Sequence, residues 1–322
     1  MSFSAILLAL LLEQARPLGP GNNAHAAIRA WVRLACNNFD AGRHPHAWLA
    51  WTVAVLTPTL LAMVIHWLLV ATVGWFLAIV WSVAVLYVSL GFRQFSHHFT
   101  DIRDALEAGD EAEARNLLAA WRQIDARELG RSEIVRQVIE HSVLAAHRHV
   151  FGVLAWFSVL AALGLGPAGA VLYRLSEFVP RYWAHQGEAQ QHPVSAALLA
   201  AARQVWYVVD WVPARITALG FAVVGSFEEA IDAWRNYAQA HGDQADHDGI
   251  ILAATSGAVN VRLGGAGTQA QAQEESANPA TPEALGQEPQ LGHLRSIVGL
   301  VWRSVVLWMV LLALLSLARL LG

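Results

Sequence analysis

Long apolar runs separated by short polar stretches dominate the chain. The first long run extends from Trp48 to Phe92 and contains no charged side chain. Because about 20 apolar residues cross the hydrocarbon core of a bilayer, this run predicts a helical hairpin of two spans. Later runs at 150–172, 205–227 and 297–321 contain glycine, proline or charged residues. We expect an all-α integral membrane protein with about four transmembrane helices.

Shorter segments complete the predicted organisation. The apolar segment Ser2 to Leu12 is only about half a span long, and we expect it to form a short N-terminal hydrophobic helix. Asp110 followed by Glu113 resembles a helix-capping box, and the apolar residues of 134–143 recur at helical spacing. These features predict an amphipathic helical segment between the second and third spans.

The expected domains follow from these segments. Residues 1–265 form a membrane domain, residues 266–292 a flexible linker rich in Gly, Ala, Gln, Glu and Pro, and residues 293–322 a C-terminal transmembrane helix. Within the membrane domain, the parts are the hairpin 47–92, the helical segment 93–149, and the spans 150–172 and 205–227.

Composition adds orientation and excludes some chemistry. The chain is 56% hydrophobic, and all 21 of its basic residues are arginine. Arginines flank both ends of the hairpin, so the positive-inside rule places segment 93–149 in the cytoplasm. Without lysine there is no P-loop lysine for nucleotide phosphates, and with one cysteine there is no disulfide framework. No feature indicates nucleic-acid binding.

Charged residues inside or beside the apolar runs are the best candidates for function. Glu140, Arg148, Arg174, Asp210 and Arg215 occupy such positions. Ionisable groups at membrane depth are costly, so they usually face a protein interior or a water-filled cavity. We therefore expect a functional site among them.

Six short motifs occur in an order that resembles one membrane-protein family. They are ALEAGDEAEAR (105–115), Asp125, RQVIE (136–140), GPAGAVLYR (166–174), VPAR (212–215) and VRLGG (261–265). The family is CobD/CbiB, which includes adenosylcobinamide-phosphate synthase and the AmpE protein. The resemblance implies a bacterial-type inner membrane.

Departures from the synthase pattern favour the AmpE side. Counted without gaps, Leu144, Ala145 and Arg148 occupy positions where the synthase has acidic or amide residues, and the DWVPAR of 210–215 is AmpE-like. The expected function is therefore an AmpE-like regulatory or ligand-sensing protein without synthase activity. Two alternatives stay open: an ATP-dependent synthase that joins an amine to a corrinoid carboxylate, and a membrane scaffold for a partner protein.

The candidate residues follow from charge and resemblance. Catalytic candidates, should the chain be an enzyme, are Glu140, Asp125 and Asp210. The predicted ligand-binding residues are Arg148, Tyr173, Arg174, Glu177, Asp210, Arg215 and Arg262. Guanidinium groups suit phosphates and carboxylates, so these residues predict a pocket for an anion.

An alternative role for these charges is structural. Arg148 would then pair with Glu140 or Glu177, and Arg215 with Asp210, as bridges between spans. The histidines at 97, 98, 141, 147 and 149 lack metal-ligand spacing, so no metal is expected. Mg²⁺ and ATP are expected only for the synthase alternative. The expected partners are the lipid bilayer, an anionic amphiphilic ligand, and a protein partner or a second copy.

Overall fold

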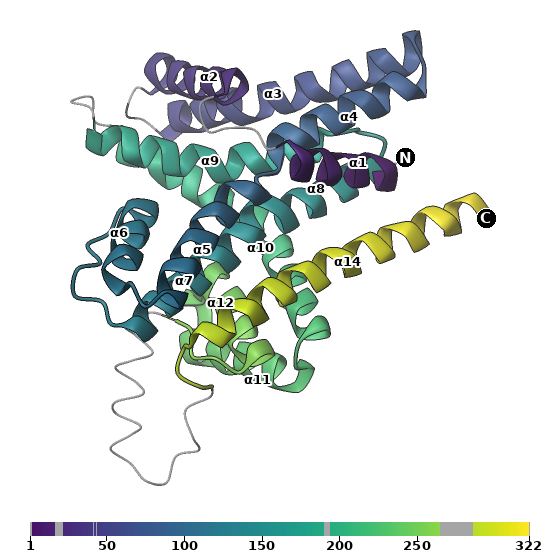
Figure 1. Ribbon diagram of the computed structural model, residues 1–322. Helices are drawn as coiled ribbons and strands as arrows, with labels where there is room; N and C mark the ends of the chain where they lie inside the picture. The colour runs from purple at the N-terminus through teal and green to yellow at the C-terminus, as the bar shows by residue number, and fades with distance from the viewer. Residues whose placement is uncertain are drawn as a thin grey trace. The chain divides into compact units, whose positions relative to one another are not determined.

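The computed structural model describes residues 2–16, 22–40, 42, 44–189, 194–264 and 286–321. Helices make up 86% of it, and no strand occurs among the described residues, which confirms the predicted all-α membrane fold (Figure 1). The helices are α1 Ser2–Ala15, α2 Asn23–Phe39, α3 His44–Thr72, α4 Trp75–Ser89, α5 Phe92–Glu107, α6 Glu111–Arg122, α7 Arg131–Ala146, the π-helical turn η1 His147–Phe151, α8 Gly152–Ala162, α9 Ala168–Ala189, α10 Ala196–Val224, α11 Phe227–His241, the 3₁₀ turn η2 Gly242–Gln244, α12 His247–Val259 and α14 Leu291–Leu321.

Four helical stretches in the described part of the chain are long and apolar enough to cross a membrane. They are Pro45–Thr72, Arg131–Ala162, Ala196–Val224 and Leu291–Ala318. Two shorter helices, Phe3–Ala15 and Trp75–Ser89, are also apolar. The chain is thus a multi-pass membrane protein, as the apolar runs predict.

The bounds of the third predicted span differ from the expected 150–172. The helical stretch begins at Arg131 and ends at Ala162, before the GLGPAGA sequence. Gly164 and Gly166 have positive φ values of 80° and 59°, a conformation that glycine adopts without steric cost. These glycines turn the chain out of α8, and α9 begins at Ala168. Residues 266–285 of the predicted linker 266–292 lie outside the described residues.

The chain divides into two compact units. The first contains Met1–Gln94, Arg148–Pro213 and Leu311–Gly322, and the second contains Phe95–His147 and Ala214–Val310. In the first unit, α3 contacts α2, α4 and α9, while α8 packs against α9. In the second unit, α12 packs against α11 and α7.

The core of the first unit joins α2, α3, α9 and the start of α10. Trp183 of α9 is fully buried, and its indole N–H donates to the Val32 carbonyl of α2 at 3.2 Å. At the end of α2, the Asp40 carboxylate accepts the backbone N–H of Ser195, just before α10, at 2.8 Å. These two contacts fix the position of α2 against its neighbours.

Glycine permits a close approach between α8 and α9. A Cβ added at Gly169 would lie 2.0 Å from the carbonyl oxygen of Trp156. The Trp156 indole N–H in turn donates to the Val209 carbonyl of α10 at 2.9 Å. The predicted GPAGA motif therefore supplies both the turn and the contact that place Tyr173 and Arg174 on α9.

The predicted helix cap and apolar face of segment 93–149 are both present, but the part from Arg131 onward belongs to the stretch Arg131–Ala162, which is long and apolar enough to cross a membrane. The Asp110 carboxylate accepts the backbone N–H of Glu113 at 2.9 Å and caps α6. On α7, the apolar face is fully buried within the chain, through Ile134, Val135, Val138, Ile139 and Val143. This face of α7 is therefore covered within the chain, and the scaffold alternative stays a prediction.

Candidate functional site

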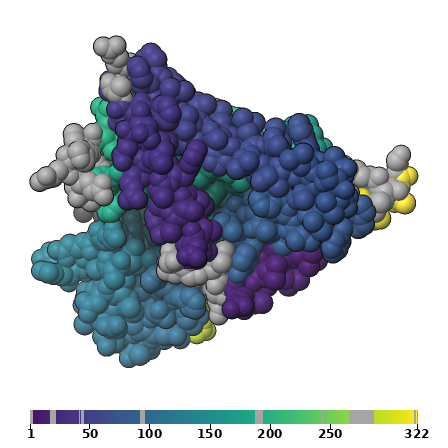
Figure 2. Space-filling model, turned by 90° about the horizontal axis from the view of Figure 1, so that it is seen from above, coloured from purple at the N-terminus to yellow at the C-terminus, as the bar shows by residue number. Residues whose placement is uncertain are grey.

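A pocket of about 870 Å³ lies in the first unit. Its walls come from α2, α3, α4 and α9, and in the space-filling view the hollow opens between α2 and the α3–α4 hairpin (Figure 2). Volumes of 300–1,000 Å³ are usual for sites that hold small molecules. The pocket is mostly apolar, with cationic side chains on α2 and α9.

A buried ion cluster on α9 borders this pocket. Glu177 is only 1% exposed at its side chain, and its carboxylate pairs with both Arg174 and Arg181. The three residues are spaced i, i+3 and i+7, so they lie on one face of the helix. Two guanidinium groups share one carboxylate, which leaves one positive charge unbalanced within the cluster.

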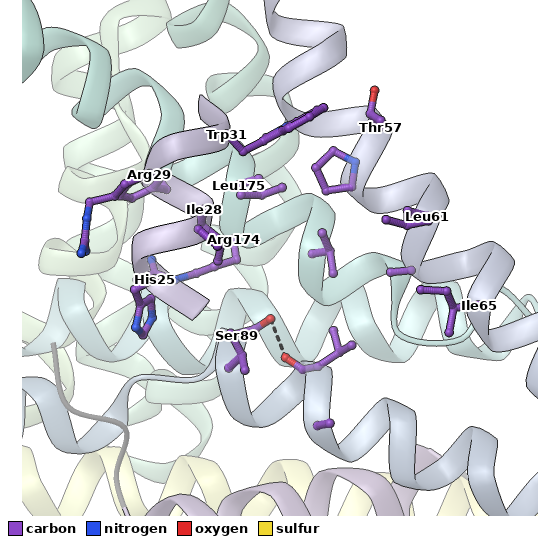
Figure 3. A pocket seen from close by; sticks show the side chains of 18 of the residues that line it. His25, Ile28, Arg29, Trp31, Thr57, Leu61, Ile65, Ser89, Arg174 and Leu175 are labelled. Atoms are coloured by element: carbon purple, nitrogen blue, oxygen red, sulfur yellow. Dashed lines mark hydrogen bonds between the residues drawn. The ribbon is translucent and has the colours of Figure 1, made fainter. Parts of the chain in front are cut away.

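Two nitrogen atoms on α2 lack hydrogen-bond partners. His25 Nδ1 and Trp31 Nε1 are buried without a partner, and both residues line the pocket. Figure 3 shows the Arg174 side chain extending from α9 toward His25. Burial first, and then the charges of Arg174 and Arg29, lower the pKa of His25 from its ordinary value of 6.5.

A second polar contact in the same unit joins α9 to α10. The Tyr173 hydroxyl donates to Asp210 Oδ1 at 2.8 Å, and both residues are fully buried. A Cβ added at Gly152 would lie 2.0 Å from the Tyr173 ring, so this glycine makes room for the tyrosine. Arg148, in the π-helical turn, is half-buried in the same unit.

A charged network in the second unit connects two of the motifs that resemble the family. Arg136 of RQVIE is 8% exposed and pairs with Glu133, and its Nη1 donates to Glu140 Oε1 at 3.2 Å. Glu140 Oε1 also accepts the backbone N–H of Gly264 at 2.8 Å, and Arg136 donates to the Gly264 carbonyl. The RQVIE motif therefore holds the VRLGG segment through the backbone N–H and the backbone carbonyl of Gly264.

The remaining predicted residues lie elsewhere in the second unit. Asp125 is exposed in the turn after α6 and accepts the Arg127 backbone N–H at 3.1 Å. Arg262 is exposed and donates to the Gly286 carbonyl at 3.0 Å. Arg215 is half-buried on α10. The predicted ligand roles of all these residues stay predictions.

The site also contains residues that the sequence analysis missed. His25, Trp31, Arg181 and Glu133 were not predicted. Arg181 had a usable signal, because it lies four residues from the predicted Glu177 on the same helix, and Glu133 lies three residues from Arg136 of the RQVIE motif. His25 and Trp31 had none, because the pocket is formed by helices that are distant in sequence.

The fold and these networks define a multi-pass helical membrane protein with buried charges in both units. The family described as CobD/Cbib protein matches residues 3–317, and the chain belongs to this family. It is 32% identical over 318 residues to "Cobalamin biosynthesis protein CobD" of Stutzerimonas stutzeri, covering 96% of each chain. A protein of the same name from Chromobacterium violaceum is 32% identical over 232 residues, covering 72% of this chain and 69% of its own. No solved structure matches the chain.

These matches correct one prediction. The AmpE-like regulatory function without synthase activity is wrong as the leading interpretation, because two relatives, one of them matching over nearly the full chain, are named for cobalamin biosynthesis. That prediction relied on departures such as Leu144, Ala145 and Arg148, counted without gaps. The candidate acids Glu140, Glu177 and Asp210, which the prediction retained, are buried and engaged with partners.

Proposed function

We propose that this chain acts in cobalamin biosynthesis as an adenosylcobinamide-phosphate synthase in the cytoplasmic membrane of a bacterium. The observation that carries the proposal is the match over 96% of both chains to a protein named for cobalamin biosynthesis. The order of the six motifs, which runs from 105 to 265, supports the same assignment. The reaction would join a phosphorylated amino alcohol to a corrinoid carboxylate.

The proposed reaction forms one amide bond. The amine nitrogen attacks the carboxyl carbon, the amine loses a proton, and one carboxyl oxygen leaves with a phosphoryl or nucleotidyl group that ATP supplies. All three reactants carry negative charge near the reacting atoms. A chain whose 21 basic residues are all arginine suits such reactants, because the guanidinium fork binds phosphates and carboxylates in two-point contacts.

Within this proposal, Glu140 is a positioning residue. It fixes the backbone N–H of Gly264, while Arg136 fixes the carbonyl of the same residue. We assign to the RQVIE and VRLGG motifs together the task of holding the backbone of Gly264 in place.

Mg²⁺ would accompany ATP in this reaction. Among the described residues, no cluster of three histidine, cysteine or acidic side chains is arranged to hold a metal ion. Mg²⁺ in nucleotide sites is commonly held by one or two carboxylates together with the substrate phosphates, which does not require such a cluster. No step of the proposal depends on a metal held by the protein alone.

Complementation tests the proposal. A strain lacking its cobinamide-phosphate synthase is scored for cobalamin-dependent growth with the wild-type chain, with Glu140→Gln and with Glu128→Gln. Glu128 is exposed on the turn before α7 and serves as the matched control. We expect growth with the wild-type and Glu128→Gln chains and loss of growth with Glu140→Gln. Absence of growth with a wild-type chain that an immunoblot detects in the membrane would refute the proposal.

A further inference from the structure

The pocket of the first unit combines an apolar wall with a cationic end. Leu61 and Ile65 of α3 and Val85 of α4 line the apolar wall, and α3 is one of the four stretches able to cross a membrane among the described residues. His25 of α2 and Arg174 of α9 line the cationic end (Figure 3). A molecule that fills this pocket must therefore match both an apolar and a positively charged surface.

The charges at the cationic end favour an anion. Among the described residues that line the pocket there is no aspartate or glutamate. Glu177 pairs with both Arg174 and Arg181, so the cluster keeps one positive charge in excess. Arg174 is the more buried of the two guanidinium groups, with its side chain 18% exposed against 52% for Arg181, and a charge held away from water is costly unless it is fully paired. An anion bound beside Arg174 would supply the missing partner.

Two buried nitrogen atoms without hydrogen-bond partners on α2 also favour a ligand with polar groups. Buried polar groups in native proteins nearly always have hydrogen-bond partners. His25 Nδ1 and Trp31 Nε1 lack them, although both residues line the same pocket. The Trp31 indole nitrogen is only a donor, and a guanidinium also only donates. The ligand must therefore offer several acceptor oxygens, which a phosphate group does.

We infer that this pocket binds an amphiphilic phosphate ester, with its phosphate against Arg174 and His25 and its apolar part along α3 and α4. This inference does not depend on the proposed synthase reaction, because it concerns the pocket alone. The two possible sources of such a phosphate are a membrane phospholipid and a water-soluble ester. The apolar wall and its place on a membrane-spanning helix favour the phospholipid.

A binding experiment with three probes tests the inference. The full chain, purified in detergent and delipidated, is titrated with dioleoyl phosphatidic acid, with dioleoylglycerol and with glycerol 3-phosphate, and binding is followed by native mass spectrometry. Phosphatidic acid and dioleoylglycerol share their acyl chains and differ in the phosphate. We expect phosphatidic acid to bind at least about tenfold more tightly than either other probe, as the loss of a charged hydrogen bond or of buried apolar area implies.

Variants assign the binding to the pocket. Arg174→Gln should weaken binding of phosphatidic acid by about tenfold or more. His25→Gln, which leaves the buried ion cluster of α9 intact, gives a second test and should weaken it severalfold. Arg33→Gln is the matched control, because Arg33 is exposed on the same helix as His25 and does not line the pocket.

Three results would overturn the inference. Equal binding of dioleoylglycerol and phosphatidic acid would show that the phosphate is not recognised. Equal binding of glycerol 3-phosphate and phosphatidic acid would show that the apolar wall contributes nothing. Unchanged binding by folded His25→Gln and Arg174→Gln proteins would place the lipid elsewhere. The outcome is separable from that of the proposed function, because no turnover is measured.

Discussion

Gly169→Ala tests the close packing of α8 against α9 that positions the site on α9. The added Cβ would lie 2.0 Å from the Trp156 carbonyl oxygen and 2.4 Å from the carbonyl carbon, where ordinary contact begins near 3.4 Å. The two helices must therefore separate by roughly 1.4 Å at this point, because backbone atoms cannot rotate away as a side chain can. Overpacking of this kind typically costs 1–3 kcal/mol, and a backbone clash lies at the upper end.

We expect Gly169→Ala to lower the free energy of unfolding by about 3 kcal/mol. Gly220→Ala is the matched control, because Gly220 also lies in a helix and a Cβ there would meet no atom within 4 Å. Alanine is favoured over glycine inside helices, so this control should raise stability by about 0.5–1 kcal/mol. Thermal unfolding of both purified variants in the same detergent measures the difference.

The expected changes in the free energy of unfolding have opposite signs for the two variants, which distinguishes a packing clash at Gly169 from a general effect of alanine in a helix. A Gly169→Ala protein that melts at or above the wild-type temperature would refute the close approach of α8 and α9. A Gly220→Ala protein that loses as much stability as Gly169→Ala would show that helical glycines in this chain have another role.

Three further predictions concern single side chains of the first unit. Tyr173→Phe removes the buried hydrogen bond to Asp210 and should cost about 2 kcal/mol in thermal unfolding, and an unchanged melting temperature would contradict this contribution. The pKa of His25 is lowered below 6.5 by burial and by Arg174 and Arg29, so its contribution to stability is complete above pH 6.5 and is lost as the pH falls through the folded pKa. His25→Gln should therefore flatten the melting temperature between pH 7 and pH 5, and an unchanged slope would contradict this cause. Burial first, and then Asp40, raises the pKa of the Cys36 thiol to about 11, so N-ethylmaleimide at pH 8 should label Cys36 only after unfolding, and rapid labelling of the folded protein by mass spectrometry would refute it.

The apolar pattern predicted most of the membrane fold. The runs at 48–92 and 205–227 and the C-terminal run correspond to helices, because apolar length alone decides whether a helix can span. The predicted bounds of the third span, 150–172, differ from the observed stretch Arg131–Ala162. The prediction ran through the GLGPAGA sequence because that sequence lies inside an apolar run, and the apolar pattern does not show that Gly164 and Gly166 adopt positive φ values. Composition therefore predicted the number of long apolar helices better than their ends.

The candidate site was predicted only in part. Glu140, Arg174 and Asp210 were selected because charges in apolar surroundings require partners, and the structure gives each of them one. The partner of Glu140, Gly264, was 124 residues away and contributes only backbone atoms, so no side-chain pattern indicates it. The prediction of an AmpE-like function without synthase activity was wrong, because it gave single positions such as Leu144, Ala145 and Arg148 more weight than a similarity that extends over 96% of the chain.

The proposed synthase activity is the central claim, and reconstitution tests it most directly. The purified wild-type chain in detergent is incubated with a corrinoid carboxylate, a phosphorylated amino alcohol, ATP and Mg²⁺, beside a synthase of established activity. Mass spectrometry then follows the amide product, whose mass is that of the two substrates less one water. We predict ATP-dependent product with the wild-type chain and a large loss with Glu140→Gln. No product from the folded wild-type chain, under conditions in which the reference synthase forms it, would contradict the account.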